Sequence, residues 1–225
     1  MNVRNANRYQ RQGSVVPSDR INDCKATVIG VGAIGRNVAL QLASIGIPQL
    51  QIVDFDIVEE TNIVTQGYLE KNLGEKKVEA TGEACRQING ELQLEVADSR
   101  FKASMDRGDI IFCCVDSMEI RELIWKAVSK DMKFFVDSRM SAETLRVLTV
   151  DSSDGFKHYP ETLFPDAEAF RGACTAKSTI YCANIAAGFL VSSFTKWLRN
   201  IPNDPDVLVN LVSNEIIVAG PDEKA

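Results

Sequence analysis

A glycine-rich turn near the start of the chain constrains its fold more than any other feature. The sequence GVGAIG at 30–35 follows an apolar, β-branched run at 25–29 and opens a helix-length segment at 35–46. A strand that turns through GxGxxG into a helix lets the backbone approach a nucleotide, and the helix N-terminus attracts phosphate. The residues expected to bind the nucleotide here are Gly30, Gly32, Ala33 and Gly35. The alternative is that these glycines only permit a tight turn.

Strand-length and helix-length segments alternate after this turn. Strands are expected at 25–29, 50–54, 92–96, 109–115, 134–137 and 144–150, and helices at 35–46, 76–89 and 118–129. The unbroken apolar run at 109–115 is typical of a strand that is covered on both faces. The alternation predicts an α/β fold with a doubly wound, mostly parallel, Rossmann-like sheet.

We expect a single domain over 1–225, because no repeat or low-complexity segment divides the chain. Its parts are an N-terminal arm (1–22), a nucleotide-binding core (23–150), a crossover loop (151–177), and a C-terminal helix with a β-hairpin (178–225). The crossover loop is expected to be irregular, since it contains prolines and glycines without a clear period. Loops of this length in compact domains are usually functional or disordered.

Composition and charge limit where the protein is expected to be located and which classes of partner it is expected to bind. The net charge of −6 gives no basic surface for nucleic acid or for an anionic membrane. The N-terminus is polar, unlike a signal peptide, and the apolar stretch at 180–194 is short and interrupted for a bilayer span. We therefore expect a soluble, cytoplasmic protein with six reduced cysteines. None of them forms a C-x-x-C pair, so no zinc is expected.

Charged residues that suit a triphosphate follow the glycine turn. Asp54 ends the second expected strand, where a carboxylate can hydrogen-bond a ribose hydroxyl. Asp56 adds a second carboxylate, which has no obvious role in a dehydrogenase. Lys77 lies near a helix start and is placed to reach phosphate, while Asp116 leaves the fourth strand at the edge where ligands bind. A carboxylate beside a triphosphate suggests Mg²⁺ as a cofactor.

The ordered set of these features resembles the ThiF/MoeB/HesA family, bacterial relatives of ubiquitin-activating enzymes. The shared features are RYQRQ at 8–12, GxGxxG, DFD at 54–56, the N-x-x-x-Q of Asn62 and Gln66, G-x-x-KVE around Lys77, and a strand-end Asp. The set is more specific than any one member, and it covers residues 8–150 well and the remainder loosely.

The resemblance implies roles for these residues. Asp54 would hold the ribose, Asn62 and Lys77 would meet the phosphates, and Asp116 would bind Mg²⁺. Arg11 would reach across the interface of a homodimer into the partner's nucleotide site. Asp56 and Gln66 would also line the nucleotide site.

The implied activity is ATP-dependent adenylation of a C-terminal carboxylate. The substrate would be a ubiquitin-like or sulfur-carrier protein that ends in a flexible Gly-Gly tail. The acyl group could then pass to Cys174 as a thioester, because a nearby helix N-terminus and Lys177 would lower the pKa of this thiol. The alternative is that Cys174 is a small residue packed under a loop.

The chain departs from the family pattern at Thr65, where relatives commonly carry an arginine that contacts the triphosphate. Losing it removes a charge-assisted and potentially bidentate phosphate contact. Arg36 and Lys76 are the candidates to replace it. The cysteine-rich zinc ribbon of many relatives is also missing.

Two other functions remain open on the sequence. The chain could be a non-catalytic scaffold, like the inactive half of a heterodimeric activating enzyme, although retention of Lys77 and Asp116 argues against this. It could also be an NAD-dependent oxidoreductase, which the two carboxylates at 54–56 disfavour. At single positions, Asn62 could merely form a turn, as could Asp56, while Lys77 and Arg11 could be surface charges.

Overall fold

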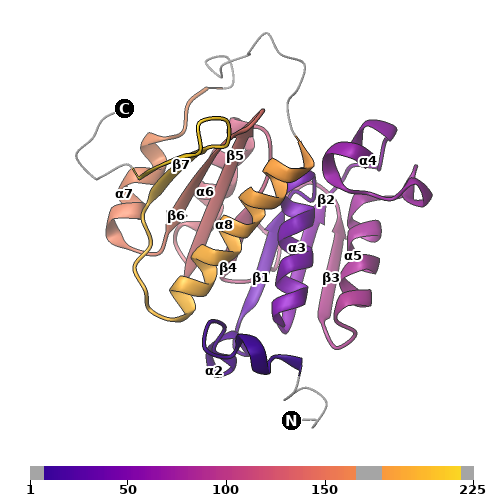
Figure 1. Ribbon diagram of the computed structural model, residues 1–225, viewed down its shortest axis with the longest axis horizontal. Coiled ribbons are helices and arrows are strands. Elements are labelled where there is room, and N and C mark those ends of the chain that lie inside the picture. Colours follow the sequence, from indigo (N-terminus) through magenta and orange to yellow (C-terminus); the bar gives the residue numbers. More distant parts are fainter. Residues whose placement is uncertain (1–7, 166–178, 219–225) are drawn as a thin grey trace.

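Within residues 8–165 and 179–218, which the computed structural model describes, eight strands form one sheet (Figure 1). The strands are β1 (Lys25–Ile29), β2 (Gln49–Asp54), β3 (Gln93–Asp98), β4 (Ile110–Cys113), β5 (Phe134–Ser141), β6 (Thr144–Val150), β7 (Asp206–Asn210) and β8 (Glu215–Val218). Their order is β3-β2-β1-β4-β5-β6-β7-β8. Neighbours from β3 to β5 are parallel and those from β5 to β8 are antiparallel. The expected C-terminal hairpin, β7 and β8, thus extends the main sheet.

Helices cover both faces of this sheet, as a doubly wound fold requires. The described helices are η1 (Gln10–Gln12), α2 (Ser18–Ile21), α3 (Ala33–Ile45), α4 (Glu60–Gln66), η2 (Glu70–Asn72), α5 (Lys77–Ile88), α6 (Met118–Val128), α7 (Ser153–Glu161) and α8 (Ile180–Leu198). Helices α3, α5 and α8 pack on one face, and α6 and α7 on the other (Figure 1). No helix of the described residues is long and apolar enough to cross a membrane.

Strand β5 shows how the sheet joins two hydrophobic cores. Successive residues of a strand point to opposite faces. Phe134 therefore packs on Phe194 of α8, with ring centroids 5.8 Å apart, and Phe135 packs on Trp125 of α6 at 5.4 Å. Both phenylalanines are fully buried, so β5 fixes the helices of the two layers against each other.

The prediction of an irregular loop over 151–177 is wrong for the first part of that range, because residues 153–161 form α7. The Ser152 side chain caps this helix by accepting from the Gly155 backbone N–H. A Cβ at Gly155 would lie 2.5 Å from the Thr149 carbonyl oxygen, so glycine here allows α7 to approach β6 closely. Pro160 lies in the last turn of α7, which ends one residue later at Glu161. Residues 166–178 lie outside the described part of the chain.

Candidate functional site

The glycine loop (residues 30–35) joins β1 to α3 at the point where the strand order reverses, between β1 and β4. Ligands bind in the crevice at such switch points. Gly30 has φ +86°, and a Cβ there would lie 2.8 Å from the Cys114 carbonyl oxygen. A Cβ at Gly35 would lie 1.8 Å from the Gly30 oxygen. Both positions therefore need glycine for the fold itself, whatever binds nearby.

Gly32 differs from these two glycines because space is open beside it. A Cβ at Gly32 would meet only the Gln66 Oε1 of the described residues, at 3.9 Å. Gly32 is also the N-cap of α3 and provides no side-chain cap. The first backbone N–H groups of α3 thus face a clear approach, which is the arrangement that binds an anion at a helix N-terminus.

Asp54 ties the end of β2 to the glycine loop. Its Oδ2 accepts a hydrogen bond from the Val31 N–H, and its Oδ1 accepts one from the Asp56 N–H, both at 2.8 Å. The side chain remains partly exposed. Each carboxylate oxygen can accept a second hydrogen bond, so Asp54 keeps the capacity to hold a ribose hydroxyl.

Asp56 and Lys77 form an ion pair at the start of α5. The Lys77 Nζ lies 3.1 Å from the Asp56 Oδ2, with the lysine side chain 8% exposed and the aspartate side chain 48% exposed. The Lys77 N–H also donates to the Asp56 carbonyl oxygen. Asp56 therefore orients the ammonium group of Lys77, a role that the sequence did not suggest. Lys77 is a buried residue and not a solvated helix charge.

Helix α4 contributes the two amide residues of the predicted site. The Asn62 Oδ1 accepts from the Glu59 N–H at 2.9 Å and so caps the helix, which leaves its Nδ2 as the group able to meet a ligand. The Gln66 Oε1 is buried and has no hydrogen-bond partner among the described residues. Such a buried acceptor near Gly32 fits a site that is completed by a polar ligand.

Tyr68 is a site residue that the sequence did not reveal. Its hydroxyl donates to the Val31 carbonyl oxygen at 2.6 Å and lies 3.0 Å from the Thr81 Oγ1 on α5. Burial raises the pKa of Tyr68, so the hydroxyl stays protonated and continues to donate. Tyr68 thereby fixes α5 relative to the glycine loop. A lone tyrosine in an irregular segment carries no sequence signal for this role.

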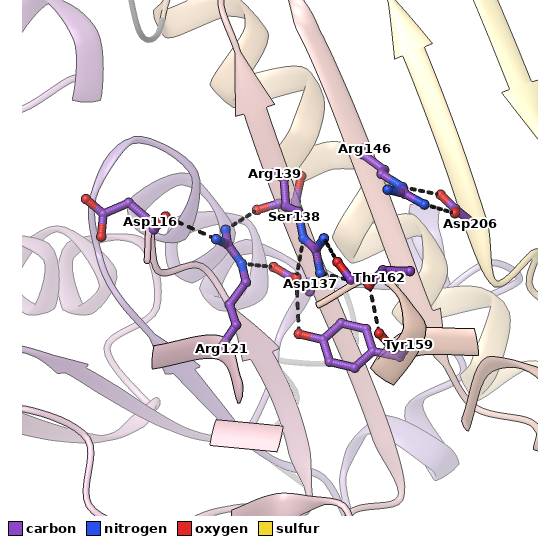
Figure 2. A network of polar contacts seen from close by, with 9 residues as sticks. All are labelled: Asp116, Arg121, Asp137, Ser138, Arg139, Arg146, Tyr159, Thr162 and Asp206. Carbon is purple, nitrogen blue, oxygen red and sulfur yellow. Dashed lines mark hydrogen bonds and ion pairs between the residues drawn. The ribbon is translucent and has the colours of Figure 1, made fainter. Parts of the chain in front are cut away.

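Asp116 lies at the end of a buried polar network (Figure 2). The Asp116 side chain is exposed and points away from the network, while its carbonyl oxygen accepts from the Arg121 Nη1 at 3.2 Å. The Arg121 Nε donates to the Asp137 Oδ1 at 3.0 Å. Burial opposes the charge of Arg121, but Asp137 raises its pKa above the ordinary value. Arg121 thus holds the backbone of the predicted metal ligand.

The fully buried Asp137 carboxylate has three partners in this network. The Arg139 Nε donates to its Oδ2 at 3.0 Å, and the Tyr159 hydroxyl donates to the same oxygen at 3.2 Å. Arg139 also donates to the carbonyl and hydroxyl oxygens of Thr162. The network therefore links β5, α6 and the end of α7 beneath Asp116.

Of the predicted site residues that the structure describes, Arg11 lies apart from the glycine loop and Lys77. Arg11 is exposed in η1, which packs at the opposite end of α3, since the Gln12 Nε2 donates to the Ile45 carbonyl oxygen at 2.7 Å. With 13 residues in α3, that end lies roughly 20 Å from Gly32. Cys174 falls outside the described residues.

The described cysteines offer no activated thiol. Five free cysteines are described, and burial raises the pKa of each, to about 11 for Cys24 and about 12 for Cys85. The other three are Cys113, Cys114 and Cys182. A thiol that attacks as the thiolate needs a lowered pKa, so these positions suit packing.

The donor set fits Mg²⁺ held together with a nucleotide better than a metal held by protein alone. No group of three or more His, Cys, Asp or Glu side chains able to hold a metal occurs in residues 8–165 and 179–218. Mg²⁺ in nucleotide sites usually binds through one or two carboxylates plus substrate phosphates. The exposed carboxylate of Asp116 is suited to that mode.

Sequence comparison identifies relatives along nearly the whole chain. The model of the ThiF family matches residues 4–217. Ubiquitin-like modifier-activating enzyme 5 of Caenorhabditis elegans is 27% identical over 216 residues, which are 85% of this chain and 51% of the relative. The Gallus gallus enzyme of the same name is 26% identical over 217 residues, covering 85% and 54%. The chain thus spans about half the length of the curated relatives it matches.

Solved structures share the fold. Escherichia coli MccB superposes with a TM-score of 0.78 at 16% identity, covering 96% of this chain and 70% of MccB. PaaA superposes with a TM-score of 0.75 at 19% identity, covering 96% and 73%. The predicted doubly wound fold and the family resemblance are confirmed.

Proposed function

The chain belongs to the ThiF family, and on that premise we propose that it uses ATP to adenylate the C-terminal carboxylate of a ubiquitin-like or sulfur-carrier protein. The observation that carries this proposal is the convergence of the glycine loop, Asp54 and Lys77 beside β1 and β2, with Asp116 following β4. The relatives named as activating enzymes support the activity. Structures titled as MccB with ATP, and with AMPCPP and MccA, support a nucleotide and a polypeptide as substrates.

The reaction needs charge stabilisation more than proton transfer. A carboxylate oxygen of the substrate attacks the α-phosphorus of ATP, the bond from that phosphorus to the β-phosphate oxygen breaks, and pyrophosphate leaves with the electron pair. The attacking carboxylate is already ionised, so no general base is required. Lys77, fixed by Asp56, would stabilise phosphate charge, and Asp54 would orient the ribose. Mg²⁺ bound by Asp116 would neutralise further phosphate charge.

Assembly and acyl transfer are further parts of the proposal. Arg11 lies about a helix length from the glycine loop of its own chain, so its proposed role is to complete the site of the partner in a homodimer. A thioester, if the reaction includes one, is proposed on Cys174, since burial raises the pKa of all five described cysteines.

Nucleotide binding separates the three candidate functions. Calorimetric titration should detect AMPCPP in the presence of Mg²⁺ and should detect no NAD⁺. Binding of NAD⁺ alone would indicate an oxidoreductase, and binding of neither would indicate a scaffold. Thermal stability gives a second readout, because a ligand at 100 times its Kd stabilises the folded state by about 2.7 kcal/mol.

Pyrophosphate exchange tests the chemistry. With a Gly-Gly-ended ubiquitin-like protein as substrate, Asp116→Ala should abolish exchange and keep the melting temperature, because its exposed side chain fills no core volume. Asp19→Ala, which removes an exposed carboxylate from α2, is the matched control and should leave exchange unchanged. Unchanged exchange in folded Asp116→Ala would contradict the metal-ligand role.

A further inference from the structure

Arg36 is a buried cation with no carboxylate partner in the described part of the chain. It is 8% exposed, and its Nε has no hydrogen-bond partner there. Arg121, buried to a similar degree, is instead paired with Asp137. Burial lowers the pKa of Arg36. Buried charges in proteins are normally paired, so the counter-charge of Arg36 is one that the described residues do not supply.

The guanidinium of Arg36 lies beside the N-terminus of α3. Its Cζ is 4.9 Å from the ring centroid of Tyr68, whose hydroxyl holds the Val31 carbonyl oxygen. The Arg36 Nη1 is 3.4 Å from the position that a Cβ on Gly67 would occupy. Stacking on Tyr68 fixes the plane of the guanidinium while leaving its in-plane N–H donors available.

A second unsatisfied group lies at the same place. The buried Gln66 Oε1 has no described partner and lies 3.9 Å from the Cβ position of Gly32. A 180° rotation of a glutamine carboxamide exchanges the positions of its oxygen, which accepts, and its NH₂ group, which donates. Arg36 and Gln66 therefore flank an open helix N-terminus with two buried polar atoms, the Arg36 Nε and the Gln66 Oε1, that have no partner among the described residues.

The other candidate groups near the loop are already engaged. The Lys76 Nζ pairs with the Asp98 Oδ1 at 3.2 Å. The Thr65 Oγ1 donates to the Thr61 carbonyl oxygen, one turn back in its own helix. Of the two candidates to replace an arginine at position 65, Arg36 and Lys76, only Arg36 has its charge unpaired among the described residues.

We propose that Arg36 binds the β- or γ-phosphate of the nucleotide at the N-terminus of α3. The proposal rests on the proposed function, because it names a phosphate ligand of the same nucleotide site. It replaces the arginine expected at position 65 with a cation from a different helix. The step is electrostatic binding only, with no bond made or broken by Arg36.

Three probes in calorimetric titration test this role. AMPCPP with Mg²⁺ carries the phosphates and the base, tripolyphosphate carries only phosphates, and adenosine carries none. Arg36→Gln should weaken AMPCPP and tripolyphosphate binding about 10- to 100-fold, as expected for a lost charge-assisted hydrogen bond. Adenosine affinity should change less than about twofold. Arg20→Gln on α2, which also loses a side-chain hydrogen bond, is the control and should change none of the three.

Two further variants guard against a purely structural effect. Arg36→Lys keeps the charge but loses the planar fork, so AMPCPP binding should fall by less than in Arg36→Gln. The double variant Arg36→Gln/Thr65→Arg should recover at least part of the lost affinity, because it returns a guanidinium to the site from α4. Circular dichroism of each variant confirms the fold.

The outcomes distinguish this inference from the proposed function. Equal AMPCPP affinity in wild type and Arg36→Gln, or equal losses for AMPCPP and adenosine, would overturn the Arg36 role and leave the proposed function standing. A third outcome would overturn the proposed function and leave the Arg36 role standing. In it, the wild-type protein binds tripolyphosphate but neither AMPCPP nor adenosine, and Arg36→Gln abolishes the tripolyphosphate binding. Wild-type protein that binds none of the probes would overturn both.

Discussion

Removing Arg121 should destabilise the protein strongly, because it breaks the buried pair with Asp137. Removal of one partner from a buried ion pair typically costs about 3–5 kcal/mol, since the other charge stays buried. Asp137 would keep two donors, the Arg139 Nε at 3.0 Å and the Tyr159 hydroxyl at 3.2 Å. We therefore expect Arg121→Met to lower the free energy of unfolding by about 3 kcal/mol, the low end of this range.

Thermal and urea unfolding measure this loss. At about 2–4 °C per kcal/mol for a chain of this size, Arg121→Met should lower the melting temperature by about 6–12 °C. Asp137→Asn should cost more, because it leaves both Arg121 and Arg139 without a carboxylate. The control is Lys126→Met, which removes an exposed pair with Glu122 and should shift the melting temperature by less than about 2 °C.

A double-mutant cycle decides whether the pair is the cause. Arg121→Met combined with Asp137→Asn should cost less than the sum of the single variants, with a coupling energy of about 2 kcal/mol. Additive costs would refute the direct pairing as the source of stability. At temperatures where Arg121→Met stays folded, its Mg²⁺-dependent nucleotide affinity should also fall, because the Asp116 carbonyl loses its donor.

Three other perturbations probe separate parts of the structure. Lys77→Ala should lower AMPCPP affinity about 10- to 100-fold in calorimetry, and unchanged affinity would remove its phosphate role. Gly35→Ala should yield no folded protein by circular dichroism, because the new Cβ would lie 1.8 Å from a loop carbonyl oxygen. Burial opposes the charge of Asp206, but hydrogen bonds from Arg146 and His158 hold its pKa below the usual value for an aspartate. The stability that this carboxylate contributes is therefore present above about pH 4 and is lost as pH falls through the folded pKa. The free energy of unfolding, measured by urea unfolding at a series of pH values, should therefore fall less steeply at acid pH in Asp206→Asn than in the wild type.

The strands and helices around the glycine loop were predictable because their signals are local. The apolar run of β1, the GxGxxG turn and the first helix all lie within residues 25–46, and the structure reproduces them within about two residues. Strand β5 was expected at 134–137 but continues to Ser141. Its second half includes Arg139, whose partners Asp137 and Thr162 make a charged residue compatible with a buried strand.

The polar contacts of the site were not predictable, because they join residues far apart in the sequence. Lys77 and Asp56 were each identified, but their pairing depends on how α5 returns to the end of β2. The contact of Tyr68 with Val31 likewise spans 37 positions and leaves no periodic pattern. Helix α4 was missed as well, since its cap uses Glu59 and Asn62 in place of the usual Ser or Thr.

The positions of the side chains change what the absence of an arginine at position 65 implies for phosphate binding. A sequence motif assigns each role to a position, so a threonine in the arginine position suggests a weakened or inactive site. Binding depends instead on where the charge lies, and a guanidinium reaches several ångströms from its own Cα. Arg36 starts from α3, yet its Nη1 approaches Gly67, two residues beyond Thr65. A chain can therefore keep a cation at the phosphates while changing the helix that supplies it, which favours an active enzyme over a scaffold as the proposed function.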